Sequence, residues 1–158
     1  MQKSPMFEIR SSSIHGLGVF ATRRIRTGTR IIEYIGERIT SEEADRRYAD
    51  DTSEHPHVLL FVVDKHTVID AAVGGNEARF INHSCEPNCK AFTEKKRIFI
   101  YSMKTIAEGE ELTYDYNLTR DGRDDEETEK RYACHCRAKT CRGTMLAPRK
   151  GRKRKITE

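Results

Sequence analysis

The sequence lacks several features that would each place it in a broad class of protein. No apolar stretch approaches the ~20 residues of a membrane-spanning helix, and the longest run is Val58–Val63. The first thirty residues contain arginines but no apolar core of a secretory signal. There is no internal repeat and no regular strand–helix alternation, which disfavours repeat proteins and dinucleotide-binding folds. We therefore expect an intracellular protein without a membrane span, in the cytoplasm or nucleoid or in the nucleus, depending on the organism.

The net charge is distributed unevenly along the chain. The 158 residues suffice for one domain with a sizeable core, and 36% are hydrophobic and 34% charged. Six basic residues lie between Arg149 and Lys155, so residues 1–148 carry a formal charge of only −1 against +4 for the whole chain. Such a run is typical of a solvated end, and we expect residues 147–158 to be a disordered basic tail. A contact with nucleic acid through Arg149–Lys155 and a targeting address are open alternatives.

The pattern of apolar and turn residues predicts a mostly β protein. One helix is expected over Glu42–Ala49, because Thr40 and Glu43 form a capping box before good helix formers. A short helical turn is expected around Asn76–Phe80. The acidic residues Asp121–Lys130 predict a mobile loop, and a border of a groove for a basic substrate is the alternative. Strands are predicted over five short runs, Arg30–Tyr34, Val58–Val63, Thr67–Asp70, Arg97–Tyr101 and Glu111–Tyr116.

The cysteines indicate a metal site. Five cysteines in an intracellular chain argue against a disulfide scaffold. Cys134, Cys136 and Cys141 supply three thiolates at close spacing, whereas a structural zinc site needs four ligands. His135 is one source of the fourth, although it lies between two ligands. Three reduced surface thiols are the alternative, and Cys89 is interpreted as a free, buried thiol.

Five segments, in this order, resemble one family. They are His15–Ala21 (HGLGVFA), Glu33–Glu37 (EYIGE), Arg79–Cys89 (RFINHSCEPNC), Glu110–Tyr116 (EELTYDY) and the cysteine segment Cys134–Cys141. Together they resemble the SET-domain protein lysine methyltransferases that carry a cysteine-rich post-SET segment.

This resemblance covers about Ile9 to Leu146 and implies a β-clip or SET fold. Such a fold has several small sheets of short strands, few short helices, a knot-like C-terminal crossing and a zinc-stapled C-terminal segment. The implied domains are a SET domain over 1–120, an acidic linker over 121–133, a post-SET zinc segment over 134–146 and the basic tail over 147–158. The resemblance supplies Cys85 as the fourth zinc ligand beside Cys134, Cys136 and Cys141.

The resemblance also implies a binding site for S-adenosylmethionine, the methyl donor. The backbone of His15, Gly16 and Leu17 would face the carboxylate end of the donor. Gly16 and Gly18 allow close approach because neither carries a Cβ, although a Gly-x-Gly pair alone is more often only a turn. The remaining implied donor residues are Arg79, Asn82 (amino group), His83 (adenine, through its backbone), Tyr116 and His135 (a cover over the adenine). Arg79 as an ion-pair partner and His83 as a hydrogen-bonded core residue are the alternatives.

Methyl transfer to lysine requires the neutral amine. With a reference pKa near ~10.4, presenting that amine at pH ~7 costs roughly 4–5 kcal/mol unless the site lowers the lysine pKa. An apolar channel lowers it by desolvation, and Tyr34, Tyr114 and Tyr116 match the channel tyrosines of the family. Tyr116 is assigned the main catalytic role, because its hydroxyl would position the lysine amine and the methyl group. Whether Tyr116 removes the lysine proton or the proton is lost to bulk water is left open. Tyr114 predicts that mono-methylation is favoured.

The alternative interpretation of each of these tyrosines is a half-buried strand residue with no part in catalysis. Glu110, Glu111 and Asp115 are interpreted as turn and surface residues. The chain departs from the family at Leu59, where relatives often carry an aromatic residue, with Phe61 assigned to the core. It departs again at Arg137, where they often carry glycine.

The resulting hypothesis is a protein-lysine N-methyltransferase that transfers a methyl group from S-adenosylmethionine to a basic protein, a histone or another chromatin-associated protein. A methyltransferase for a non-histone protein is a variant of it. The alternative from another class is a non-catalytic, zinc-stabilised module that binds nucleic acid or chromatin through its basic tail. The oligomeric state is left open.

Overall fold

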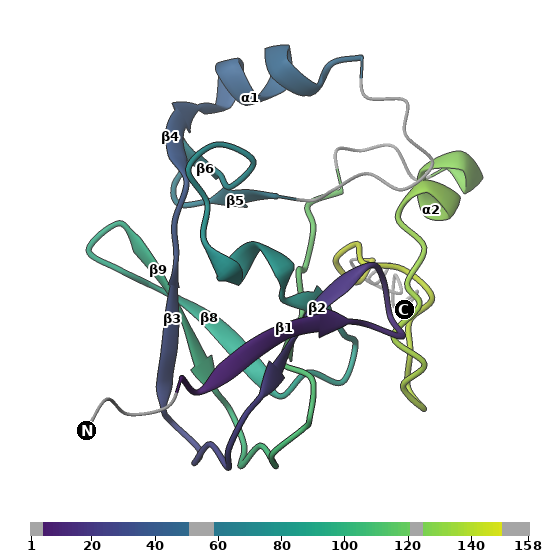
Figure 1. Cartoon of the computed structure of the whole chain (residues 1–158). Helices are drawn as coiled ribbons and strands as arrows, with labels where there is room; N and C mark the ends of the chain where they lie inside the picture. Colours follow the sequence, from purple (N-terminus) through teal and green to yellow (C-terminus); the bar gives the residue numbers. More distant parts are fainter. Residues whose placement is uncertain (1–4, 51–58, 121–124, 150–158) are drawn as a thin grey trace, which may run out of the picture.

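The computed structural model describes residues 5–50, 59–120 and 125–149, and the regular structure within these ranges is mostly β (Figure 1). The strands are β1 (Phe7–Ser11), β2 (Leu17–Ala21), β3 (Arg30–Tyr34), β4 (Glu37–Thr40), β5 (Leu60–Val62), β6 (Thr67–Asp70), β7 (Asn82–His83), β8 (Cys89–Glu94), β9 (Arg97–Ser102) and β10 (Thr113–Tyr114). The helices are α1 (Ser41–Tyr48), α2 (Glu126–Arg131) and the 3-10 turn η1 (Glu77–Phe80). The predicted fold class is confirmed, and β10 is shorter than the predicted strand over Glu111–Tyr116.

The largest sheet contains the crossing that positions the site. Its strand order is β3-β9-β8-β10-β7, and β10 pairs in parallel with both β7 and β8. Tyr114 lies opposite His83 on one side and Cys89 on the other. Because β10 lies between two strands joined only by residues 84–88, that connection passes over the end of β10. The resemblance to the family predicted a knot-like crossing of the C-terminal part of the chain. The pairing of β10 with β7 brings the EELTYDY and RFINHSC segments side by side.

The two smaller sheets flank this one. The β1–β2 hairpin crosses the front of the molecule in Figure 1, and its turn approaches the C-terminal segment, drawn in yellow. The third sheet has the order β4-β6-β5 and carries α1 at its end. Strand β5 is therefore an edge strand, and Val58 of its predicted run lies outside the described residues.

Helix α1 forms for the reason that the sequence suggested. The hydroxyl of Thr40 accepts a hydrogen bond from the Glu43 backbone N–H at 3.1 Å, which is the N-cap interaction. The Glu43 carboxylate binds Arg46 and Arg47, each at 2.7 Å, instead of returning to the Thr40 backbone. Only the first half of the capping box is thus present. The predicted helical turn is η1, and the Asn76 side chain caps it.

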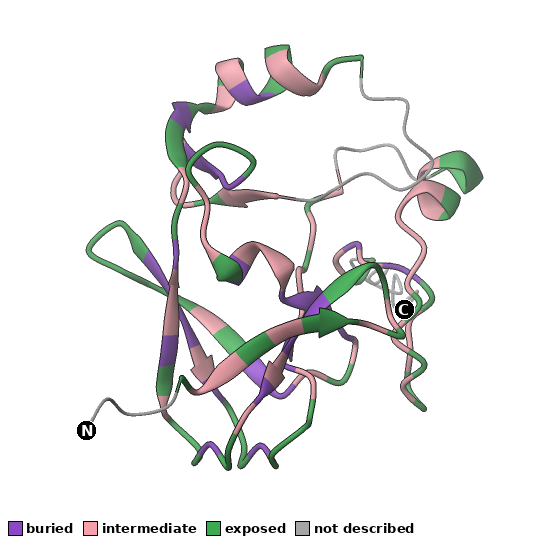
Figure 2. Cartoon of the chain, in the orientation of Figure 1, coloured by how far each residue is buried: buried purple, intermediate pink, exposed green. Residues whose placement is uncertain are grey.

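The core lies between the large sheet and the hairpin. Figure 2 shows buried positions along the central strands, whereas exposed positions dominate the hairpin turn and the helices mainly mix exposed and intermediate positions. The largest fully buried side chains are mainly aliphatic and come from across the fold: Ile25, Ile69, Ile81, Ile98, Ile100, Ile106 and Leu112. Asp70 is buried among them and accepts hydrogen bonds from Arg47 and Tyr48, as expected of a buried acid.

The acidic segment differs from its prediction. We expected a mobile loop over Asp121–Lys130, but Glu126–Arg131 form α2, because Asp125 caps the helix and Glu126 pairs with Lys130 at 2.9 Å. Residues 121–124 of that segment and 150–158 of the basic tail lie outside the described residues. Neither α-helix in the described part of the chain is long and apolar enough to cross a membrane.

Candidate functional site

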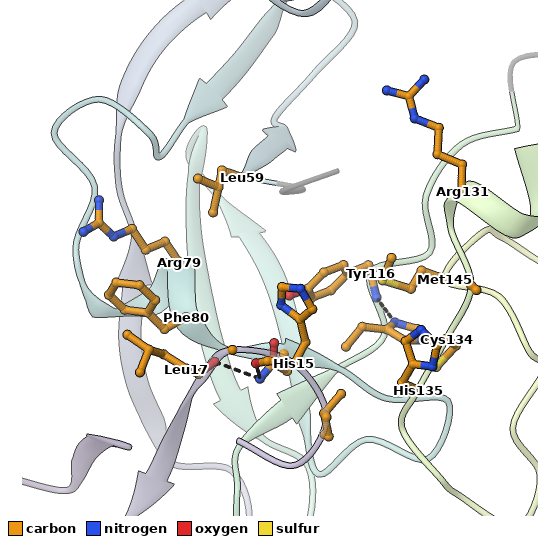
Figure 3. A pocket seen from close by; sticks show the side chains of 15 residues that line it. His15, Leu17, Leu59, Arg79, Phe80, Tyr116, Arg131, Cys134, His135 and Met145 are labelled. Carbon is orange, nitrogen blue, oxygen red and sulfur yellow. Dashed lines mark hydrogen bonds between the residues drawn. The ribbon is translucent and has the colours of Figure 1, made fainter. Parts of the chain in front are cut away.

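The first cavity lies where the hairpin turn, η1, β7 and the C-terminal segment meet. It has a volume of about 300 Å³, and His15, Arg79, Tyr116 and His135 are among the residues that line it (Figure 3). Of the residues predicted to bind the methyl donor, eight line this cavity: His15, Gly16, Leu17, Arg79, Asn82, His83, Tyr116 and His135. Gly18 was also predicted to bind the methyl donor but does not line this cavity. Segments more than a hundred residues apart in the sequence thus share one wall.

Asn82 holds the hairpin turn against β7. Its side-chain N–H group lies 3.2 Å from the carbonyl oxygen of His15 and 3.0 Å from that of Leu17. Between these residues Gly16 has a φ of +46°, a conformation that suits glycine. The same amide group donates to the Glu111 carboxylate at 2.9 Å, so the amide oxygen is left as an acceptor.

Glu111 is a site residue that the sequence did not reveal. We expected a surface residue, but its carboxylate accepts hydrogen bonds from Asn82 and from the Ser12 hydroxyl. A Cβ on Gly18 would lie 2.3 Å from the Glu111 carboxylate oxygen. Gly18 therefore makes room for Glu111 behind the turn. Nothing in the sequence distinguishes Glu111 from the neighbouring Glu110.

Arg79 does not form the ion pair that was its alternative interpretation. Among the described residues its guanidinium group makes no ion pair, and its Cζ lies 4.7 Å from the centre of the Phe80 ring. The buried Nε atom has no hydrogen-bond partner within the described part of the chain. Arg79 thus keeps one buried N–H donor, Nε, that the described residues leave unused.

A row of aromatic rings runs from the core to this cavity. The ring centres of Tyr34 and Phe61 are 5.2 Å apart, those of Phe61 and Tyr114 6.1 Å, and those of Tyr114 and Tyr116 4.9 Å. Burial raises the pKa of all three tyrosines above its usual value. Each phenol therefore keeps its proton at neutral pH.

The hydroxyl of Tyr116 donates a hydrogen bond to the Ile81 carbonyl at 2.6 Å. That of Tyr34 donates to the Leu59 carbonyl at 2.7 Å. Both proton positions are thus directed at the backbone, and the oxygen lone pairs remain as acceptors. This geometry disfavours Tyr116 as a general base.

A second cavity lies on the other side of Tyr116. It has a volume of about 560 Å³, and β5, β8 and residues 114–119 form its walls. Tyr114 and Phe61 line this cavity, and Tyr116 lines both cavities. Leu59 lines the first one.

Phe61, and not Tyr34, reaches the second cavity. Tyr34 was expected along the channel, yet it lines neither cavity and its side chain is 2% exposed. It packs against Phe61, which we assigned to the core and which packs against the core cluster while also lining the second cavity. Both β3 and β5 end their sheets, so the difference comes from packing and not from sheet position: the Phe61 ring lies against Tyr34, which is buried.

The four cysteines predicted as ligands come together. The Sγ atoms of Cys85, Cys134, Cys136 and Cys141 all lie within 4.8 Å of one another, so they could hold a metal ion. Cys85 Sγ is 3.8 Å from that of Cys134 and 3.9 Å from that of Cys141. A tetrahedron with Zn–S bonds of about 2.3 Å has edges of about 3.8 Å, so the spacing fits zinc. His135 and Cys89 are not part of this cluster.

His83 connects the cysteine cluster to Tyr116. Its Nδ1 accepts a hydrogen bond from the Tyr116 backbone N–H at 3.0 Å, and its Nε2 lies 3.4 Å from Cys85 Sγ. Burial lowers the pKa of His83 to about 4, so the ring is neutral. With Nδ1 accepting, the proton is on Nε2 and faces the sulfur.

The cysteine segment is also tied down without a metal. Arg142 forms a two-pronged ion pair with Asp115 at 2.9 and 3.0 Å, and Thr140 donates to the Glu86 carboxylate. Ala133, Cys134, His135 and Met145 then complete the wall of the first cavity. Arg137 has a φ of +59°, which explains why glycine suits that position.

The comparisons with known proteins agree with this architecture. Residues 16–117 match the family model of the SET domain, and the chain belongs to that family. It is 44% identical over 151 residues to the histone-lysine N-methyltransferase, H3 lysine-4 specific, of Saccharomyces cerevisiae, covering 91% of the chain and 13% of that protein. It is 41% identical over 138 residues to histone-lysine N-methyltransferase 2D of Homo sapiens, covering 85% of the chain and 2% of that protein.

A third relative is histone-lysine N-methyltransferase set-2 of Caenorhabditis elegans, with 44% identity over 150 residues, 90% of the chain and 9% of that protein. The chain therefore spans only a small part of the length of these relatives.

Proposed function

We propose that this protein is an S-adenosylmethionine-dependent protein-lysine N-methyltransferase whose substrate is a histone tail. The observation that carries the proposal is the pair of cavities that share Tyr116. A donor in the first cavity and a lysine entering through the second would meet at the Tyr116 hydroxyl. The relatives are named histone-lysine N-methyltransferases, and the yeast one is named as H3 lysine-4 specific, which supports a histone H3 tail as the first substrate to test.

The first cavity has the groups that a sulfonium donor requires. The amide oxygen of Asn82 is an acceptor for the amino group of the donor, and the turn at His15–Leu17 offers backbone atoms to its carboxylate end. The His83 backbone and the His135 side chain would border the adenine. Arg79, with its buried unpaired Nε, would contact the polar part of the donor. Leu59 offers apolar contact where relatives often have an aromatic ring.

The reaction is a direct displacement. The lone pair of the lysine nitrogen forms a bond to the methyl carbon as the carbon–sulfur bond breaks, and S-adenosylhomocysteine leaves. The amine proton is lost to water, because the raised pKa of Tyr116 and its hydrogen bond to Ile81 disfavour a phenolate base. Tyr116 would position the nitrogen and methyl group through its oxygen lone pairs, and most of the acceleration would come from this alignment.

We also propose that the four-cysteine cluster holds a structural zinc ion. Four thiolates at this spacing are the donor set of such a site. The neutral His83 ring, with Nε2–H directed at Cys85, would stabilise the negative charge of the thiolate. The metal would hold the post-SET segment (134–146) over the SET domain (1–120). Chromatin in the nucleus is the location that this substrate implies.

The test is transfer of a labelled methyl group. The protein is incubated with isotopically labelled S-adenosylmethionine and a histone mixture, and the products are identified by mass spectrometry. We expect label on a lysine side chain. A chain that binds nucleic acid but transfers no label would instead favour the non-catalytic module.

The residue-level test is Tyr116→Phe. We expect transfer to fall by roughly a hundredfold, since one oriented polar group at a reacting centre is worth that much, while donor binding is retained. Tyr101→Phe is the matched control, because the Tyr101 hydroxyl binds Glu94 on the solvent side of β9. Equal turnover by Tyr116→Phe would contradict the assigned role.

A further inference from the structure

Arg142 places a positive charge from the cysteine segment against Asp115, a residue that lines the second cavity. Its guanidinium group binds both oxygens of Asp115, and Asp115 lies between Tyr114 and Tyr116 and lines that cavity. Burial alone would raise the pKa of Asp115, but the Arg142 hydrogen bonds hold it below its usual value. The carboxylate is therefore ionised and paired, with its side chain still 31% exposed.

The other charged groups around Asp115 do not replace Arg142. His83 approaches Asp115 only to 3.6 Å, through the Nδ1 atom that accepts the Tyr116 N–H group, and makes no hydrogen bond to the carboxylate. Lys90 lines the same cavity from β8, and its ammonium group lies over the Phe92 ring. Glu111 adds negative charge on the other side of Tyr116. Of the described cations, Arg142 alone is in hydrogen-bond contact with Asp115.

An unpaired carboxylate at this wall would oppose methyl transfer. A nearby negative charge favours the protonated form of an amine, and only the neutral amine can attack the methyl carbon. We propose that Arg142 is a charge-compensating residue, which cancels the Asp115 carboxylate so that the incoming lysine is not held as an ammonium ion. The inference rests on the proposed function and assigns Arg142 a role in it beyond the metal site.

The test is the pH dependence of kcat with a histone H3 tail peptide at saturating donor. Arg142→Met leaves Asp115 unpaired, and we expect the profile to move to higher pH by roughly half to one unit, which is about three- to tenfold less activity below the apparent pKa. Arg142→Lys keeps the charge and should stay near the wild-type profile. Asp115→Asn leaves the positive charge of Arg142 without its carboxylate partner, and we expect the pH profile of kcat to move to lower pH.

The double variant decides between charge and structure. Arg142→Met with Asp115→Asn removes both charges, and we expect its profile to return to that of the wild type. Loss of activity that Asp115→Asn does not rescue would overturn the proposal. Should Arg142→Met fail to fold, the shift of Asp115→Asn toward lower pH carries the test alone, and an unchanged profile would contradict it.

Arg120→Met is the matched control. Arg120 also pairs with a carboxylate, Glu129 at 2.6 Å, and binds the Ala147 carbonyl of the C-terminal segment, but neither cavity is lined by Glu129. We expect an unshifted profile, and metal content is measured for every variant, since the Arg142 backbone N–H to Cys85 is retained. An equal shift in Arg120→Met would overturn the proposal. An inactive wild-type chain contradicts the proposed function and this inference with it, whereas an active wild type with unshifted variants contradicts this inference alone.

Discussion

At the scale of single residues, the site depends on atoms whose directions are set by their hydrogen bonds. The Tyr116 hydroxyl donates a hydrogen bond to the Ile81 carbonyl, and the Tyr116 backbone N–H donates one to Nδ1 of His83. The Asn82 side-chain amide donates hydrogen bonds to the carbonyl oxygens of the hairpin turn and to the Glu111 carboxylate. In each case the bond to the protein leaves one acceptor, the phenol oxygen or the amide oxygen, free to face the ligand.

Tyr114 limits the space beside Tyr116, and Tyr114→Phe tests that limit. The two rings are 4.9 Å apart, and Tyr114 lines the cavity proposed for lysine. Removing the hydroxyl, or a water bound to it, makes room for an already methylated amine. We expect the products to shift from mono-methyl toward di- and tri-methyl lysine, measured by mass spectrometry of the peptide. An unchanged product ratio would show that Tyr114 does not set the degree of methylation.

At the scale of elements, the cysteine segment carries a backbone conformation that its sequence does not favour. Arg137 is exposed and adopts a φ of +59°, which costs a residue with a Cβ about 1 kcal/mol. We expect Arg137→Gly to raise the Tm by about 1–3 °C, because relief of this strain outweighs the added freedom of glycine in the unfolded chain. The measurement is thermal unfolding of the metal-loaded protein.

Arg137→Ala is the control for that prediction. It removes the side-chain charge but keeps a Cβ, so the Tm should stay at the wild-type value. A lower Tm for Arg137→Gly would show that the arginine side chain stabilises the segment more than its φ destabilises it.

Sequence patterns predicted the elements better than their roles. The runs at 30–34, 67–70 and 97–101 are strands because β-branched and aromatic side chains suit a pleated, half-buried surface. Part of the acidic segment forms α2 because Asp125 is a good N-cap. The sequence analysis missed this local signal because it relied on the high negative charge of the segment to predict a loop. The sequence did not predict that Phe61, and not Tyr34, would line the second cavity, because a strand residue has the same pattern whether it faces a cavity or the core.

At the scale of the whole molecule, the four-cysteine cluster and both cavities form one connected unit. Cys85 contacts His83, His83 binds the backbone of Tyr116, and Tyr116 lines both cavities. The segment that holds the other three cysteines also forms one wall of the first cavity, the one proposed for the methyl donor. Metal binding and donor binding should therefore be coupled, because ligands that favour the same conformation stabilise each other's site.

Chelation tests this coupling. Removing the metal leaves four thiols that no longer hold the segment, so we expect donor affinity to fall at least tenfold and protease cleavage near residues 134–146 to increase. Donor affinity is measured by calorimetry, with metal loss verified by elemental analysis. The pair between Arg142 and Asp115 should retain part of the docking. Unchanged affinity after complete metal loss would contradict the proposed cover.

The sequence alone identified the family, the mostly β class and the close trio Cys134, Cys136 and Cys141, because spacing and residue type are local properties of the chain; the resemblance to the family then supplied Cys85. Only the tertiary structure decided that Glu111 supports the hairpin turn, that Phe61 rather than Tyr34 lines the second cavity and that Arg142 neutralises Asp115. Each of these depends on side chains brought together by the pairing of β10 between β7 and β8, and no pattern along one segment encodes a contact with another.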